Sequence, residues 1–201
     1  MRCYLTPMIR SYADKRLQQF AEKGRGGGLP VENVARVRRM LTALKNASQL
    51  SDMNLPGYGF HQLKGQGRGA YSDHRLGQLA NAVRVGPGRG ERALGGLSLM
   101  AGDTELTGLE PMHPGELLRE DVLPALGISK TAVAEHLGIS RTTLYELLRE
   151  ETPVTPRLAL RLGKLCGNGP KLWLNLQQDY DLRTLEPQMA QDLQQIPTLS
   201  G

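Results

Sequence analysis

The chain has 201 residues, a formal net charge of +5 and two cysteines, and these numbers exclude several classes of protein. Cys3 and Cys166 are too few, and lie too far apart in the sequence, for a disulfide framework or a metal cluster. No apolar run reaches the length of a membrane span or of a secretory signal. We therefore expect a cytoplasmic protein of one or two small domains that needs no metal, cofactor or membrane.

The positive charge is concentrated in the amino-terminal part of the chain. Residues 1–110 contain 16 Lys and Arg against 9 Asp and Glu, whereas residues 111–201 contain 9 against 11. Net charge therefore gives no support to nucleic-acid binding by the carboxy-terminal part. Such a function must be argued from the geometry of its motifs.

Residues 31–47 are predicted to form an amphipathic helix. Its apolar positions recur at the spacing of one helix face, at Val34, Val37, Leu41 and Leu44. Most of the other face is basic and carries Arg36, Arg38, Arg39 and Lys45. A helix of this kind suits a phosphate backbone, so the sequence indicates a nucleic-acid contact here.

The same part of the chain carries a first family resemblance. Two segments within about residues 8–72 carry it, MIRSYADKRLQQFAEKG and VENVARVRRMLTALKNASQLSDMNLPGYGFHQLKG. They resemble the opening of the RelE-like HigB toxins. Those toxins are small ribosome-associated endoribonucleases, so the resemblance implies an α+β toxin fragment in residues 1–72. In an extended segment after Pro56, it makes His61 a proton-transfer group and Lys64 a counter-charge for phosphate. Without the resemblance, a His beside a Lys is more often structural or solvated.

The toxin resemblance ends before the segments that supply most of the catalytic side chains in that family, a G-N-W-R strand and a D-Y-H tail. In their place, residues 65–99 are rich in glycine and arginine, and 13 of the 24 glycines of the chain fall between Gly57 and Gly108. Without β-branched or aromatic runs, no strand or long amphipathic helix is predicted in residues 65–99. We expect a disordered linker over residues 73–111.

A frameshift is our hypothesis for this change of character. Residues 72–100, back-translated with permitted codons and read one nucleotide later, can spell RITVSGNWRMRF and then a tail ending in ADYH and a stop codon. That stop would overlap the ATG of Met100, as expected for a toxin gene followed directly by its antitoxin gene. The shift would lie near residues 70–72. An intact upstream reading frame without those motifs would contradict the hypothesis.

Residues 112–184 contain five predicted helices with clear boundary signals. Pro114 suits the first position of a helix that ends near Gly127. Pro156 opens the fourth helix, and Gly167 stops it.

The fifth predicted helix begins at Pro170 and ends at residues 179–181. Its Trp173 is assigned to core packing, with contact to a second copy of the chain as the alternative. Residues 185–201 are then a tail with one short helix, Met189 to Leu193.

The most informative stretch is SKTAVAEHLGISRTTLYELLR, residues 129–149, which has the spacing of two helices that cross at a glycine turn. Ser129 and Ser140 can cap the two helices, and the small Ala134 falls where they come closest. Gly138 can take the positive φ that the turn needs. This pattern predicts a helix-turn-helix with double-stranded DNA as its partner. The alternative is an ordinary helical hairpin whose exposed face meets water.

A second family resemblance, over about residues 100–184, is carried by three segments: HPGELLRE, this helix-turn-helix and TPRLALRLGKLCGNGPKLWLNLQQDYDL. Together they resemble the HigA-type addiction-module antitoxins, a branch of the Cro/C1-like repressors. The resemblance implies a homodimer that binds a palindromic operator, represses its own operon and neutralises a HigB-type toxin. One departure is CGNGPKLW, where the family usually has a serine before the proline, which weakens a helix cap. By motif position, the resemblance assigns base contacts to Ser140, Arg141, Thr142 and Tyr145, and phosphate contacts to Lys130, Thr131 and Arg149.

The predicted fold is therefore mainly α. It combines a carboxy-terminal five-helix Cro/C1-like domain with an amino-terminal α+β fragment of a RelE-like toxin fold and a glycine-rich linker. The favoured function is a DNA-binding antitoxin and autorepressor that is not an enzyme, with an inactive amino-terminal passenger. The alternatives are a toxin–antitoxin fusion that still cleaves RNA, or one that docks on ribosomal RNA without cleaving it.

Overall fold

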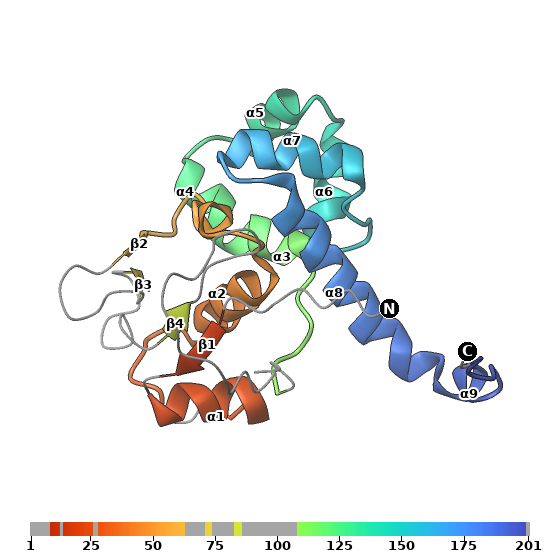
Figure 1. Cartoon of the computed structure of the whole chain (residues 1–201). Coiled ribbons are helices and arrows are strands. Elements are labelled where there is room, and N and C mark those ends of the chain that lie inside the picture. Colours follow the sequence, from red (N-terminus) through yellow and green to blue (C-terminus); the bar gives the residue numbers. More distant parts are fainter. Residues whose placement is uncertain are drawn as a thin grey trace.

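The structure is a computed structural model of the whole chain, and it describes residues 9–12, 14–25, 28–62, 71–73, 83–85 and 108–199. Over these residues the protein is mainly helical, with the amino-terminal elements on one side and the helix-turn-helix on the other (Figure 1). Helix α8 (Pro170–Gln188) begins among the other helices, and its second half projects away from them (Figure 1). Among the described residues, none of the helices combines the length and apolar character needed to cross a membrane.

The amino-terminal part contains both helices and strands. The strands pair antiparallel in two ladders, β1 with β4 and β2 with β3. In chain order the elements are β1 (Ile9–Tyr12), α1 (Lys15–Lys23), α2 (Val34–Asn46), the 3-10 turn η1 (Leu50–Met53), β2 (Phe60–Gln62), β3 (Tyr71–Asp73) and β4 (Val83–Val85).

Two of these strands correct the sequence analysis. β3 and β4 lie within residues 65–99, where no strand was predicted, and β4 lies within the predicted linker. Each strand has only three residues, which is too short to show an alternating pattern. β4 pairs with β1, which is far away in the sequence. A pattern of neighbouring residues cannot predict such a pairing.

Helix α2 confirms the helix predicted over residues 31–47. It begins after Asn33, whose side chain accepts a hydrogen bond of 2.8 Å from the backbone N–H of Arg36. Val37, Leu41 and Leu44 are buried, as the apolar period predicted. α1 begins in the same way, because the Asp14 side chain accepts a hydrogen bond of 2.7 Å from the Arg16 N–H.

The carboxy-terminal helices begin at the predicted residues. The helix predicted from Pro114 is divided by a π-helical turn, in which the Leu123 N–H donates to the carbonyl of Leu118. In chain order the elements are α3 (Pro114–Leu117), the π turn η3 (Leu118–Val122), α4 (Leu123–Leu126), α5 (Lys130–Leu137), α6 (Arg141–Leu148), α7 (Pro156–Cys166), α8 and α9 (Ala190–Gln194).

The predicted end of the fifth helix at residues 179–181 is wrong, since α8 continues to Gln188 and takes up the start of the predicted tail. Asp179 and Asp181, which were expected to end the helix, instead lie within it and bind partners on α8 and on α2. Asp181 accepts a hydrogen bond of 2.8 Å from Gln177, one helical turn earlier. Asp179 is paired with Lys45 of α2 at 2.8 Å.

One hydrophobic core joins the two parts of the chain. Its buried residues include Leu17 and Leu44 from the amino-terminal helices and Leu118 and Leu176 from the carboxy-terminal ones. Trp173 is fully buried in it, which confirms the core assignment, and its indole N–H donates to Asn168 at 3.2 Å.

The end of the predicted linker also belongs to this core. Leu109 is buried, and the N–H of Gly108 donates to the Ala21 carbonyl of α1 at 3.2 Å. The carbonyl of Leu109 accepts a hydrogen bond from Arg183 of α8. The structure therefore corrects the linker prediction at Gly108 and Leu109, which contact α1 and α8.

Gly115 of α3 lies against the backbone of α6. A Cβ atom at Gly115 would overlap the carbonyl group of Leu147. We expect Gly115→Ala to lower the free energy of unfolding by about 3 kcal/mol, because the two helices must move apart. Urea denaturation followed by circular dichroism would measure this loss.

Gly127→Ala is the matched control. Gly127 has a positive φ of 64°, but a Cβ atom there meets nothing within 4 Å. Only backbone strain is added, so the expected loss is about 1 kcal/mol. Equal losses for the two variants would contradict a steric role for Gly115.

Candidate DNA-binding site

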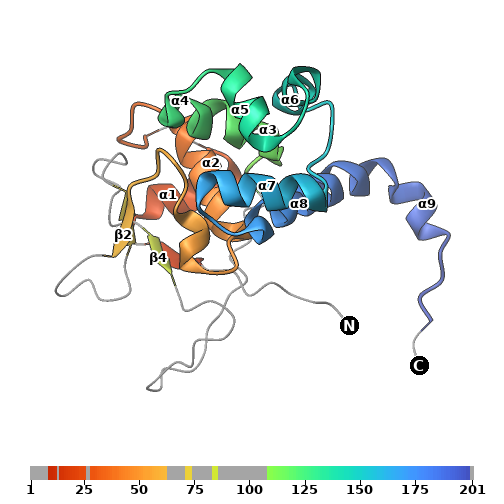
Figure 2. The ribbon, with the colours of Figure 1, turned by 90° about the horizontal axis from the view of Figure 1, so that it is seen from above.

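The turn between α5 and α6 has the geometry predicted for a helix-turn-helix. Gly138 ends α5 with φ 60°, and the N–H of Ile139 donates to the Ala134 carbonyl at 3.0 Å. Ala134 is buried at this crossing. The two helices lie along one edge of the molecule, away from the strands (Figures 1 and 2).

Both helices begin at the predicted serine caps. The Ser129 hydroxyl accepts a hydrogen bond of 3.2 Å from the Ala132 N–H, and the Ser140 hydroxyl accepts one of 3.0 Å from the Thr143 N–H. The Ser140 hydroxyl also lies 2.9 Å from the Thr143 hydroxyl. Ser140 is one of the predicted base-contacting residues, and it is exposed. Its hydroxyl is already hydrogen-bonded as the cap of α6.

The outer face of α6 gathers most of the predicted contact residues. Leu144, Leu147 and Leu148 are buried, which turns the opposite side of the helix outward. An open pocket on that side is lined by Arg141, Thr142, Tyr145 and Arg149.

The first turn of α5 adjoins the same face. The Lys130 ammonium lies 5.4 Å from the centre of the Tyr145 ring, a cation–π distance. Thr131 is exposed beside it. The structure thus brings a lysine of α5 next to the exposed side chains of α6.

Arg149 is held in an ion pair at the end of α6. Its guanidinium donates two hydrogen bonds, of 2.9 and 2.8 Å, to the carboxylate of Glu151. The hydrogen bonds from Arg149, together with its positive charge, lower the pKa of Glu151. Both side chains are exposed, and exposed pairs contribute little stability, so a phosphate could compete for Arg149.

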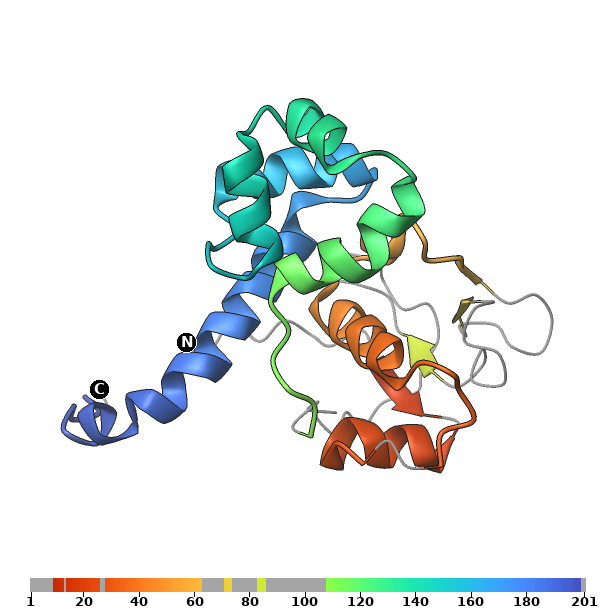
Figure 3. The same cartoon turned by 180° about the vertical axis from the view of Figure 1, so that it is seen from behind.

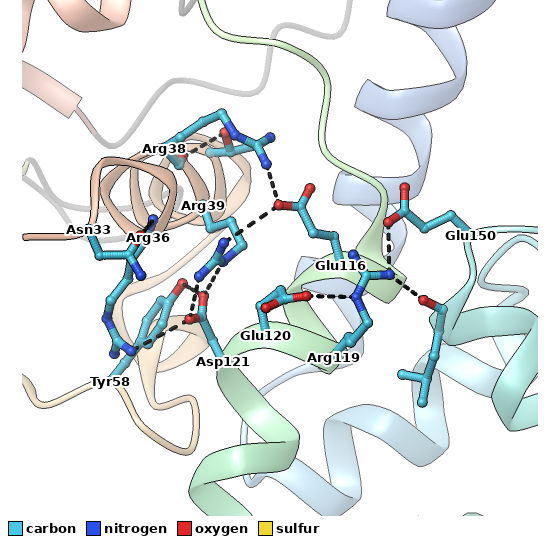
Figure 4. Close-up of polar contacts among 12 residues, drawn as sticks. Asn33, Arg36, Arg38, Arg39, Tyr58, Glu116, Arg119, Glu120, Asp121 and Glu150 are labelled. Carbon is cyan, nitrogen blue, oxygen red and sulfur yellow. Dashed lines mark hydrogen bonds and ion pairs between the residues drawn. The ribbon is translucent and has the colours of Figure 1, made fainter. Parts of the chain in front are cut away.

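Two further arginines hold the helix-turn-helix in place. The sequence analysis did not assign either of them to the site. Arg161 of α7 donates to the carbonyls of Leu137 and Gly138 at 2.8 and 2.6 Å, which fixes the turn. Arg119 of η3 donates to the Leu148 carbonyl and, at 3.0 Å, to Glu150 (Figure 4). These contacts join separate elements, and no local sequence pattern signals them.

Glu150 shows how tightly the end of α6 is defined. It has a φ of 68°, which is unusual for a residue with a side chain. Its N–H donates to the Leu147 carbonyl at 3.0 Å while its carboxylate meets Arg119. Backbone and side chain together therefore hold the residue in this conformation.

The other candidate residues from the sequence analysis are His61 and Lys64. The backbone of His61 lies in β2, but its side chain and the whole of Lys64 lie outside the described residues. Within the described residues, no three histidines, cysteines or acids gather as a metal site. His113 caps α3, where burial lowers its pKa and the ring Nδ1 accepts a hydrogen bond of 3.0 Å from the Gly115 N–H.

The chain matches known proteins through this motif. A helix-turn-helix family model matches residues 118–173. Virulence-associated protein I of Dichelobacter nodosus is 39% identical over 100 residues, which cover 50% of this chain and 86% of that protein.

Antitoxin HigA-1 of Vibrio cholerae is 36% identical over 72 residues, which cover 36% of this chain and 68% of that protein. Among solved structures, a Pseudomonas aeruginosa antitoxin HigA with the higBA promoter is 33% identical, with a TM-score of 0.43, 45% of this chain covered and 100% of that one. The identities with HigA-1 and with virulence-associated protein I extend over more than two thirds of each relative. The chain therefore belongs to the helix-turn-helix family of HigA-type antitoxins.

Proposed function

We propose that the chain binds double-stranded operator DNA and represses its own operon as a HigA-type antitoxin. The single observation that carries this proposal is the outer face of α6, where Arg141, Thr142 and Tyr145 are exposed around an open pocket. In a helix-turn-helix, this face of the second helix enters the major groove. Membership of the family supports the same function.

The chemistry of the exposed side chains suggests a role for each. The Arg141 guanidinium can donate two hydrogen bonds to a guanine, while the methyl group of Thr142 can meet a thymine. Lys130, Thr131 and Arg149 lie where phosphate contacts would fix the orientation of the helix. Arg149 would exchange its Glu151 partner for a phosphate on binding.

The first test is a gel shift with DNA from upstream of the gene, in about 150 mM salt. We expect Arg141→Ala plus Tyr145→Ala to weaken sequence-selective binding at least about tenfold, because base contacts are lost. The wild-type chain should discriminate this DNA from unrelated DNA of the same length.

Lys23→Ala is the control for lost positive charge. Lys23 is exposed at the end of α1, which lies at the opposite side of the molecule from α6 (Figure 1). This variant should bind like the wild type. Equal, salt-sensitive binding by all three proteins would contradict the proposal, because the chain would then attract DNA only through its overall charge.

We also propose that the chain acts as a homodimer on a palindromic operator. Exposed apolar residues line the projecting half of α8 and the short α9, and they include Leu182, Leu185, Met189 and Leu193. A row of apolar side chains at helical spacing suits burial against a second copy. The two recognition helices of a dimer would then read the two halves of a palindrome.

Leu182→Glu plus Leu185→Glu tests the dimer. We expect the wild type to have twice the 22.1 kDa mass of one chain and the double variant to have the single mass, because the contact would have to bury two carboxylates from each chain. Analytical ultracentrifugation measures the change. Leu160→Glu, an exposed leucine on α7, is the control and should stay dimeric. A monomeric wild-type chain would overturn this part of the proposal.

For the amino-terminal part, we propose a truncated, frameshift-derived fragment of a HigB-like toxin without ribonuclease activity. The ion pairs of α2 support this view. Arg36, Arg38 and Arg39 were expected to be available to a phosphate backbone, but they contact the carboxylates of Glu116 and Asp121. Those arginines are therefore occupied within the chain.

A ribonuclease assay on mRNA with ribosomes separates this proposal from an active fusion. We expect no cleavage by the wild-type chain and no difference for His61→Ala plus Lys64→Ala, because phosphoryl transfer needs several positioned groups acting together. An isolated HigB-type toxin is the positive control. Cleavage by the wild type that the double variant loses would favour the active fusion.

A further inference from the structure

The backbone at the end of α6 has the hydrogen bonds of a Schellman motif. The N–H of Glu151 donates to the Glu146 carbonyl at 2.9 Å, and the N–H of Glu150 donates to the Leu147 carbonyl at 3.0 Å. Glu150 has the positive φ, 68°, that this motif requires. Glycine is the usual residue there, because a Cβ atom makes the conformation costly. A glutamate at this position therefore requires a compensating contact.

Arg119 of η3 supplies that contact. Its guanidinium donates to the Glu150 carboxylate at 3.0 Å and to the carbonyl of Leu148 (Figure 4). The last carbonyls of a helix have no partner within it, and the helix dipole favours a cation beside them. We call Arg119 and Glu150 the α6 brace. The brace stabilises both the backbone and the side chain of the residue that ends the helix.

The brace belongs to a segment that lies directly against α6. Gly115, one turn before Arg119, places its backbone against the Leu147 carbonyl. Seen from behind, the start of the green α3 segment meets the end of α6 (Figure 3). The two side chains of the brace expose 35% and 30% of their surface, against 58% and 53% for Arg149 and Glu151. Salt screens a partly shielded pair less, so the brace should persist in the binding assay.

Two arginines fix the two ends of α6. Arg161 holds the turn before the helix by donating to the carbonyls of Leu137 and Gly138 at 2.8 and 2.6 Å. Arg119 holds the other end at Leu148. A helix anchored at one end alone can change direction, whereas contacts at both ends define its axis. The brace therefore controls where the exposed side chains of α6 point.

We propose that Arg119 is a positioning residue for operator recognition, which acts through Glu150 on the direction of α6 and on the adjacent Arg149. This inference rests on the proposed function of α6. A sequence-specific complex needs its base and phosphate contacts in one register, whereas non-specific binding depends on phosphate charge alone. Loss of the brace should therefore weaken operator binding more than binding to unrelated DNA.

The test compares Arg119→Gln with the wild type in gel shifts. We expect at least about fivefold weaker binding to DNA from upstream of the gene, and less than about a twofold change with unrelated DNA of the same length, because the register of the base contacts is lost. The slope of log Kd against log salt should stay the same, since loss of a phosphate contact would change it by about one. A changed slope would overturn the proposal, because Arg119 would then contact DNA directly.

A second substitution tests whether Arg119 acts through Glu150. Glycine adopts a positive φ without strain and leaves no carboxylate without its partner. We expect Arg119→Gln plus Glu150→Gly to bind operator DNA within about twofold of the wild type, since the end of the helix no longer needs the brace. A double variant that binds as weakly as Arg119→Gln would overturn the proposal.

Arg16→Gln is the matched control. Arg16 of α1 also donates to a carboxylate, that of Asp14 at 2.7 Å, and to a backbone carbonyl, that of Gly28 at 3.4 Å. Helix α1 lies on the opposite side of the molecule from α6 (Figure 1). This variant loses the same charge and should keep the operator selectivity of the wild type. An equal loss of selectivity would contradict a specific role for Arg119.

Hydrogen exchange separates this inference from the proposed function, because it needs no DNA. We expect Arg119→Gln to speed exchange of the Glu150 and Glu151 N–H groups at least about tenfold, with α5 unchanged, since only the end of α6 opens more often. Glu150→Gln, which keeps the Leu148 contact, is milder and should have a smaller effect. Unchanged exchange in both variants would overturn the positioning role. If the wild type selects no operator, the proposed function fails by itself, and the exchange rates still decide whether Arg119 holds α6.

Discussion

The buried carboxylate of Asp121 is the interaction on which the arrangement of the two parts depends. It lies in the π turn η3 and receives Arg39 and Tyr58 from the amino-terminal part at hydrogen-bonding distance. Burial of an ion pair gives little net stability, but removal of one partner leaves a charge in the interior. The contact therefore specifies one relative position of α2 and η3, and the surrounding apolar residues supply most of the attraction.

The same turn also supports the recognition helix. Arg119, two residues before Asp121, reaches the Leu148 carbonyl and Glu150 at the end of α6, while Asp121 faces α2 (Figure 4). The turn thus connects two neighbours through side chains that point in different directions. A π turn is well suited to this, because its wider spacing shifts side chains relative to a regular helix. The turn η3 thus contacts both α6, which would read DNA, and α2 of the amino-terminal part.

Local signals explain which features the sequence predicted. The caps Ser129 and Ser140 and the turn at Gly138 depend on residues at most a few positions apart, and the structure has each of them as expected. The buried stripe of α6 follows from its period in the same way. The pairing of β4 with β1, the contacts of Arg119 and Arg161 and the continuation of α8 depend on residues distant in the sequence. A local pattern cannot contain that information.

The basic helix α2 shows why charge pattern alone does not identify a partner. The pattern of Arg36, Arg38 and Arg39 would be the same whether these side chains meet phosphates or carboxylates, because both are anionic groups that accept hydrogen bonds from guanidinium. In this chain carboxylates occupy them. The basic excess of the amino-terminal part is thus partly neutralised within the molecule. Selective DNA binding must then come from the few exposed side chains of α5 and α6, whose geometry discriminates where net charge does not.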